Sequence, residues 1–219
     1  MQNKVVLFDI DHTLFNTDKY QKEAFEKIAL LFGEKPAEEV ISSAKEVYLK
    51  IREVDIFHPY RFGQKLNEFL VGNVNPEKIA AIFEDKNFLA SCVYDDIHAT
   101  LETLSKNDLT LGIFSTGEKK LQMEKIDVIG HFFNQEDIHI YPLKDIEIPR
   151  ILKQYKDKKV YIIDDILRVL EEVDRQSASV TKIWITRKGA SYHDGSDGKF
   201  MPTKHITSLS EVIGIVCTD

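Results

Sequence analysis

Two short apolar runs, far apart in the chain, each end in a pair of acidic residues. Residues 4–8 precede Asp9 and Asp11, and residues 160–163 precede Asp164 and Asp165. Apolar runs of this length are typical of strands that are buried on both faces of a parallel sheet. Ligands of such folds bind at the edge where the strands have their carboxyl ends. The sequence therefore predicts an α/β fold with four carboxylates gathered at that edge.

The remaining strand-like runs alternate with helical ones. Apolar strands are expected at residues 109–114, 137–141 and 182–185, and helices at residues 117–126, 148–155, 166–175 and 209–216. A further helix, capped by Asp95 and Asp96, precedes the second strand. Strands that alternate with helices predict a parallel sheet with right-handed crossovers, covered by helices on both faces.

Helical periodicity replaces this pattern for about 80 residues after the first acidic pair. One apolar stripe comprises Tyr20, Ala24, Ile28 and Leu31, and Asn75 followed by Pro76 is typical of a helix start. We expect four short helices with their own core. A helical module thus interrupts the α/β domain between its first and second strands.

Composition excludes several classes of protein. The chain has 219 residues, 43% of them hydrophobic, and a net charge of −7, which argues against nucleic-acid or anionic-membrane partners. No run approaches the roughly 20 apolar residues of a membrane span. The first strand begins at residue 4, so we expect no signal peptide.

Cys92 and Cys217 are expected to be free, buried thiols, which predicts a cytoplasmic protein. Oligomeric state is not predicted.

The acidic residues indicate metal-assisted phosphoryl chemistry, because four neighbouring carboxylates repel one another and favour a divalent cation. Asp9 is the candidate nucleophile, which would form an acyl phosphate. Asp11 is placed to protonate the leaving oxygen and later to activate water. Asp164 and Asp165 would hold Mg²⁺, with the Asp9 side chain and the Asp11 backbone carbonyl completing the metal site.

The charge of the transferring phosphoryl group requires donors as well. Ser115, at the end of the second strand, offers a hydroxyl, and the helix that begins near Gly117 offers backbone N–H groups. Lys144 offers an ammonium group, with Lys119 and Lys153 as alternatives.

These residues also form four motifs in order along the chain. They are residues 9–17 (DIDHTLFNT), 111–117 (LGIFSTG), 142–145 (PLKD) and 162–165 (IIDD). With these motifs the chain resembles the haloacid dehalogenase-like (HAD-like) hydrolase superfamily over nearly its whole length. Three positions depart from the usual family pattern. His12 stands where glycine is usual, Thr116 stands where asparagine is common, and Asp145 follows Lys144 where proline is frequent.

The resemblance implies a Rossmann-like catalytic core of residues 1–16 and 91–219, with a helical cap domain at residues 17–90. It also implies Mg²⁺, an aspartyl-phosphate intermediate, and phosphate binding by Ser115, Thr116 and Lys144. Family members that dehalogenate lack an aspartate at the position of Asp11, and ion-pumping members carry threonine there. We therefore expect a phosphatase that acts on a small phosphorylated metabolite. A sugar phosphomutase and a non-catalytic phosphate-binding regulatory protein are the alternatives.

Two further segments contain polar residues outside these motifs. Residues 55–61 are aromatic and basic, so His58, Tyr60 or Arg61 could select the substrate, although a packed turn between helices explains the same pattern. Residues 193–198 contain oxygen ligands and glycines but lack calcium-loop spacing, which predicts a surface loop.

Overall fold

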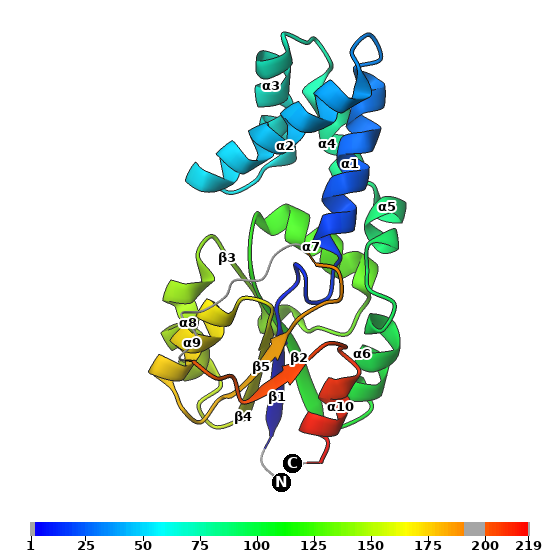
Figure 1. Cartoon of the computed structure of the whole chain (residues 1–219). Coiled ribbons are helices and arrows are strands. Elements are labelled where there is room, and N and C mark those ends of the chain that lie inside the picture. The colour runs from blue at the N-terminus through cyan, green and yellow to red at the C-terminus, as the bar shows by residue number, and fades with distance from the viewer. Residues whose placement is uncertain (1–2, 191–199, 219) are drawn as a thin grey trace. The chain divides into compact units, whose positions relative to one another are not determined.

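The protein forms two compact units in a computed structural model that describes residues 3–190 and 200–218. One unit is α/β and comprises Met1–Asn16 and Val93–Asp219, and the other is helical and comprises Thr17–Cys92 (Figure 1). The chain thus leaves the α/β unit after its first strand and re-enters it before its second. The predicted surface loop at residues 193–198 lies outside the described residues.

The helical unit contains α1 (Thr17–Leu31), α2 (Ala37–Val54), α3 (Pro59–Leu70), α4 (Pro76–Glu84) and α5 (Lys86–Ser91). As predicted, Asn75 starts α4, because its side chain accepts a hydrogen bond from the Glu77 N–H at 2.9 Å. Asp85 accepts from the Phe88 N–H at 2.7 Å and starts α5, a helix that the sequence pattern did not predict. Four helices were expected here, and the structure describes five.

Aromatic side chains form the centre of the helical unit. Phe57 lies 5.5 Å from Phe62 and 5.1 Å from Phe83 between ring centroids, and Phe25 stacks on Phe62 at 6.0 Å. Such ring pairs contribute stability beyond their buried area. The helical unit therefore has a core of its own.

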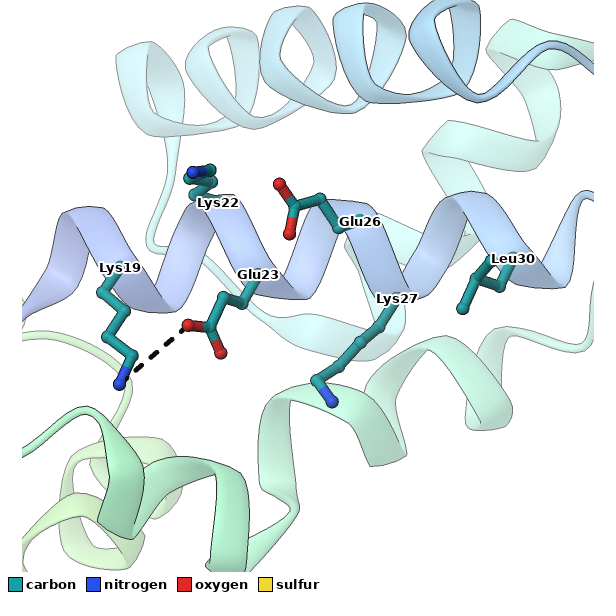
Figure 2. A pocket seen from close by; sticks show the side chains of 6 residues that line it. All are labelled: Lys19, Lys22, Glu23, Glu26, Lys27 and Leu30. Carbon is teal, nitrogen blue, oxygen red and sulfur yellow. Dashed lines mark ion pairs between the residues drawn. The ribbon is translucent and has the colours of Figure 1, made fainter.

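A groove of about 590 Å³ lies along α1. Figure 2 shows the six side chains that line it, which are Lys19, Lys22, Glu23, Glu26, Lys27 and Leu30. Lysine and glutamate side chains both line this groove, and none of the residues predicted for the active site lines it.

The α/β unit is built on a parallel sheet with strand order β3-β2-β1-β4-β5-β6 in the part of the chain that is described. The strands are β1 (Lys4–Phe8), β2 (Leu109–Thr116), β3 (Ile138–Tyr141), β4 (Lys159–Asp164), β5 (Thr181–Ile185) and β6 (Lys204–Ile206). β1 is central, and its last residue, Phe8, pairs with Ile113 of β2 and Ile163 of β4. The residues that follow these three positions therefore meet at one edge of the sheet.

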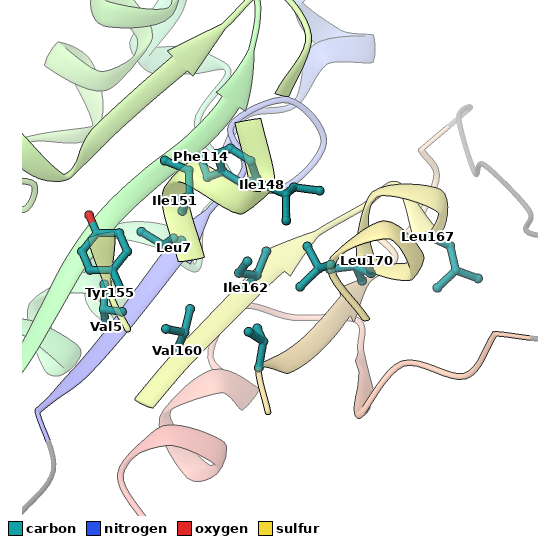
Figure 3. Close-up of a cluster of buried hydrophobic side chains, with 12 residues drawn as sticks. Val5, Leu7, Phe114, Ile148, Ile151, Tyr155, Val160, Ile162, Leu167 and Leu170 are labelled. Atoms are coloured by element: carbon teal, nitrogen blue, oxygen red, sulfur yellow. The ribbon is translucent and has the colours of Figure 1, made fainter. Parts of the chain in front are cut away.

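Helices cover both faces of this sheet (Figure 1). They are α6 (Ile97–Ser105), α7 (Lys119–Ile129), α8 (Ile148–Gln154), α9 (Leu167–Gln176) and α10 (Glu211–Val216). On one face, Val5, Leu7 and Ile162 pack against Ile148 and Leu170 of the helices α8 and α9 (Figure 3). Full burial of each apolar side chain of this size stabilises the folded state by about 1.5–3 kcal/mol. The expected α/β architecture with a Rossmann-like parallel sheet is confirmed.

Several local predictions need correction. β6 was not predicted, because its three residues do not form an apolar run. Asp96 precedes α6 but makes no side-chain capping bond to that helix. Its carboxylate instead accepts hydrogen bonds from Arg187, Ser208 and the Leu209 N–H, each at 2.7 Å. Neither cysteine forms a disulfide among the described residues, as expected, but Cys217 is exposed rather than buried. None of the described helices is both long and apolar enough to cross a membrane.

Candidate active site

Asp9 follows β1 at the carboxyl edge of the sheet. Its backbone N–H donates to the Ile163 carbonyl at 2.9 Å, which extends the β1–β4 pairing by one residue. Its carboxylate is buried, and its Oδ1 lies 2.5 Å from the Lys144 Nζ. The same ammonium group lies 2.6 Å from the Asp164 Oδ2. Lys144 thus joins the ends of β1 and β4 from a 3₁₀ helix that begins shortly after β3.

Lys144 is the lysine at this position, and the two alternatives lie elsewhere. Its side chain is only 2% exposed. Lys119 and Lys153 are exposed on α7 and α8. Burial alone would lower the pKa of Lys144, but the attraction of Asp164 and Asp9 outweighs burial and raises it, so the side chain stays protonated.

Three buried acidic side chains at this edge, Asp9, Asp164 and Asp165, lie around the single ammonium group of Lys144, which contacts Asp9 and Asp164. Burial raises the pKa of Asp9 and of Asp164. The pKa of Asp165 is raised by burial first and then by repulsion from Asp9 and Asp164. The Asp164 Oδ1 accepts from the Ile166 N–H at 2.9 Å, and the Asp165 carbonyl accepts from the Trp184 indole at 2.9 Å, so β4, α9 and β5 position this pair.

These residues fit a magnesium ion in donor type and in charge. Mg²⁺ prefers oxygen ligands and is bound through one or two carboxylates plus other oxygens. Asp9, Asp164 and Asp165 are buried oxygen donors, and one ammonium group, that of Lys144, contacts only the first two. In this structure, Asp9 and Asp164 are bonded to Lys144. Residues 3–190 and 200–218 contain no group of three or more His, Cys, Asp or Glu side chains that could hold a metal ion as they stand.

Ser115 lies beside Asp9 at the end of β2. The side chain is fully buried, and its hydroxyl makes no hydrogen bond of normal geometry with any described residue. It is nevertheless close enough to the Asp9 carboxylate to favour the ionised form of that acid. A buried hydroxyl without a partner is costly, which makes it a ready donor for a ligand oxygen. Thr116 follows, half-buried, and its carbonyl accepts a hydrogen bond from the Gln122 side chain at 2.8 Å.

Asp11 is bonded to two side chains of α7 that the sequence analysis missed. The Gln122 Nε2 donates to the Asp11 Oδ2 at 2.8 Å, and the Lys125 Nζ donates to the Asp11 Oδ1 at 2.7 Å. Both α7 side chains are buried, next to the apolar Leu121 and Ile126. Two polar residues on the buried side of a helix were the sequence signal that could have indicated them.

The loop after Asp9 has an unusual backbone at His12. The Ile10 carbonyl accepts hydrogen bonds from the N–H groups of Leu14 and Phe15 at 2.9 Å each, which turns the chain tightly. His12 adopts the left-handed conformation with φ 55°. Glycine adopts this conformation without strain, and among other residues asparagine, aspartate and histidine tolerate it best. The turn therefore explains why histidine can replace glycine here.

The predicted substrate-selecting residues lie in the helical unit. His58 immediately precedes α3, and His58, Tyr60 and Arg61 are exposed. Arg61 Nη1 lies 3.2 Å from the Asp55 Oδ2 in an exposed ion pair. Phe57, by contrast, is buried in the aromatic core. The segment is thus a turn between α2 and α3 that Phe57 anchors, and substrate selection by its three exposed side chains stays a prediction.

The sequence matches one family model over more than half of its length. The model for haloacid dehalogenase-like hydrolases covers residues 6–149, which include Asp9, Asp11, Ser115 and Lys144. The chain belongs to the HAD-like hydrolases.

Relatives of this HAD-like hydrolase include a glyceraldehyde 3-phosphate phosphatase of Methanopyrus kandleri. The two are 28% identical over 196 residues, which are 82% of this chain and 83% of the relative. A haloacid dehalogenase-like hydrolase from Burkholderia xenovorans LB400 has the same fold, with a TM-score of 0.76, 18% identity and coverage of 100% and 98% of the two chains. A β-phosphoglucomutase structure from Thermotoga maritima has a TM-score of 0.65, 16% identity and coverage of 98% and 99%. The last two similarities describe the fold of the HAD-like hydrolase rather than its substrate.

Proposed function

We propose that this HAD-like hydrolase is a Mg²⁺-dependent phosphatase that hydrolyses a small phosphate monoester through an aspartyl-phosphate intermediate. The contact of Lys144 with both Asp9 and Asp164 carries the proposal. The ammonium group of Lys144 joins two buried carboxylates at the ends of neighbouring strands, and the buried Ser115 hydroxyl lies beside Asp9. The phosphatase relative supports the same reaction class.

In the first step, an Asp9 oxygen attacks phosphorus while the bond from phosphorus to the ester oxygen breaks. Asp11 donates a proton to that leaving oxygen. The Ser115 hydroxyl and the Lys144 ammonium group donate to the phosphoryl oxygens, whose charge they stabilise. The product of this step is the released alcohol and phosphorylated Asp9.

In the second step, water attacks the phosphorus of the aspartyl phosphate, and Asp11 accepts the proton of that water. The bond between phosphorus and the Asp9 oxygen breaks, so inorganic phosphate leaves and the carboxylate is restored. A bound Mg²⁺, held by Asp9, the Asp11 carbonyl, Asp164 and Asp165, would neutralise phosphate and carboxylate charge. Asp164 and Asp165 serve to hold that ion.

The helical unit is assigned the role of a cap in this proposal. Its aromatic core is its own, as a cap that closes as one body would require. A cap excludes bulk water from the reacting groups and limits access to small substrates. His58, Tyr60 and Arg61, exposed on this unit, are the candidates for contact with the leaving group.

Phosphate release from simple esters tests the proposal. The purified chain is assayed with 4-nitrophenyl phosphate in Mg²⁺ and in a chelator, alongside Asp9→Asn. We expect activity in Mg²⁺ only, and loss of at least about 10³-fold in Asp9→Asn. Activity that is indifferent to both the chelator and the substitution would overturn the mechanism.

A substrate panel then identifies the natural ester. It should contain glyceraldehyde 3-phosphate, sugar phosphates and nucleoside monophosphates, with release of inorganic phosphate as the readout. Interconversion of sugar phosphate isomers without phosphate release would indicate a phosphomutase instead. Binding of phosphate esters without any turnover would indicate a regulatory protein.

A further inference from the structure

Both oxygens of the Asp11 carboxylate accept hydrogen bonds from α7. The Gln122 Nε2 lies 2.8 Å from the Oδ2, and the Lys125 Nζ lies 2.7 Å from the Oδ1. Two donors on two different oxygens fix the plane of a carboxylate as well as its position. Asp9, two residues earlier, is bonded to Lys144 instead. The two acids that follow β1 are therefore held by two different lysines.

Gln122 is itself held in place by the end of β2. The same Nε2 that bonds Asp11 also donates to the Thr116 carbonyl at 2.8 Å. The Gln122 side chain lies over Gly117, where a β-carbon would be only 2.6 Å from the Nε2 and 2.9 Å from the Cγ. Gly117 thus leaves the space that the Gln122 amide occupies. This arrangement ties Asp11 to the strand that carries Ser115.

Lys125 is buried, so its ammonium group depends on Asp11 as an acidic partner. Its side chain is 4% exposed, and its ammonium group lies 4.8 Å from the centre of the Phe15 ring. A buried ammonium group is costly unless it meets an acid and further favourable groups. The Asp11 side chain retains 27% exposure, so the pair is open to a ligand from the Asp11 side.

We propose that Gln122 and Lys125 are positioning residues that hold Asp11 for proton transfer. The inference rests on the proposed function, because it concerns the proton that Asp11 gives to the leaving oxygen and takes from water. Neither side chain needs to touch the substrate. They act by restricting the Asp11 carboxylate to one orientation, which is the requirement for efficient transfer over a hydrogen bond.

The leaving group separates this role from a merely structural one. An alkoxide leaving group requires a proton when its bond to phosphorus breaks, whereas dinitrophenolate is stable without one. Loss of Asp11 positioning should therefore slow the hydrolysis of alkyl phosphates far more than that of dinitrophenyl phosphate. General damage to the fold would slow the hydrolysis of both esters to the same extent.

The test compares kcat and KM of Lys125→Met and Gln122→Leu on glycerol phosphate and on 2,4-dinitrophenyl phosphate, with Mg²⁺. We expect kcat to fall about 10–100-fold on glycerol phosphate and less than about threefold on dinitrophenyl phosphate. KM should change little on both, because the ground-state contacts of the phosphoryl group are retained. Lys120→Met, an exposed lysine on the same helix, is the matched control and should behave as the wild type.

A double variant shows whether Lys125 acts through Asp11. Asp11→Asn combined with Lys125→Met should be no slower on glycerol phosphate than Asp11→Asn alone. Equal losses on both esters, unchanged kcat in both single variants, or additive losses in the double variant would overturn the positioning role while leaving the phosphatase proposal intact. A wild-type chain that hydrolyses neither ester would overturn the proposed function and this inference together.

Discussion

Arg187 donates two hydrogen bonds to the backbone carbonyl of Thr13, a residue 174 positions earlier in the chain. The Nε and Nη2 lie 3.1 and 2.6 Å from that oxygen, and the Nη1 lies 2.7 Å from the Asp96 Oδ2. The guanidinium carbon also lies 4.2 Å from the centre of the Tyr94 ring. One buried cation thus ties the loop after β1, which carries the two candidate catalytic acids, to the start of α6.

Arg187→Met should destabilise the α/β unit by about 2–3 kcal/mol. The substitution retains much of the side-chain volume but leaves the Thr13 carbonyl and the largely buried Asp96 carboxylate without the guanidinium group. Urea unfolding measures the change. Lys188→Met, which removes an exposed cation one residue later, is the control and should stay within about 0.5 kcal/mol of the wild type. Equal stability of the two variants would show that the contacts of Arg187 with Thr13 and Asp96 do not stabilise the fold.

Asp96 should make the stability of the α/β unit depend on pH. Burial opposes its ionisation, but hydrogen bonds from Arg187 and Ser208 outweigh burial and lower its pKa. A carboxyl group with a depressed pKa in the folded state stabilises the fold above its unfolded pKa of about 3.9. That contribution is lost as the pH falls through the folded pKa.

The measurement compares the wild type with Asp96→Asn across pH. The difference in unfolding free energy between them should be constant from about pH 7 to pH 5 and should shrink below about pH 4. A difference that grows toward acidic pH would contradict the depressed pKa of Asp96.

The sequence predicted the elements that have strong apolar patterns. β1, β2, β4 and β5 are buried runs, and their acidic or hydroxyl ends marked Asp9, Ser115 and Asp164. β6 escaped prediction because its three residues form no apolar run, and α5 because its six residues follow α4 after a single residue and read as part of the same pattern.

Long-range polar contacts could not be predicted from local patterns. Asp96 has the residue type and position of a helix cap, but its Oδ2 accepts hydrogen bonds from Arg187 and from the loop before α10. Gln122 and Lys125 lie on the apolar side of a helix, but only the pairing of β1 and β2 brings Asp11 against them. Such pairings depend on the sheet order, which no single segment encodes.

Val71→Gly should stabilise the helical unit by about 1 kcal/mol. Val71 follows α3 in the left-handed conformation with φ 51°, which is unfavourable for a β-branched residue. Its side chain is 93% exposed, so its removal costs little packing. Thermal unfolding measures the gain. Val54→Gly, at an equally exposed but helical position, is the matched control and should not stabilise the unit.

Lys144→Met should lower kcat about 10²–10³-fold on 4-nitrophenyl phosphate, because a charge that stabilises the phosphoryl group is lost. The same change removes the ammonium group between Asp9 and Asp164, so the unfolding free energy should fall as well. Lys153→Met tests the alternative lysine on α8 and should retain full activity. Loss of activity in Lys153→Met together with full activity in Lys144→Met would show that Lys153, and not Lys144, stabilises the phosphoryl group.

Asp165→Asn should stabilise the metal-free protein and weaken its response to Mg²⁺. Asp165 is 4% exposed, and burial and then repulsion from Asp9 and Asp164 raise its pKa, so its ionisation opposes folding at neutral pH while no cation is bound. Asparagine has the same shape without the charge, and it leaves the backbone carbonyl that accepts from Trp184 unchanged. In a chelator, the gain in unfolding free energy should be about 1–3 kcal/mol.

In millimolar Mg²⁺, the rise in melting temperature that we expect for the wild type should be reduced or lost in Asp165→Asn, because one carboxylate ligand is missing. Asp157→Asn removes an exposed acid and should change neither quantity. A variant that is less stable than the wild type in chelator, and that keeps the full Mg²⁺ shift, would show that Asp165 belongs to the folded core rather than to a cation site.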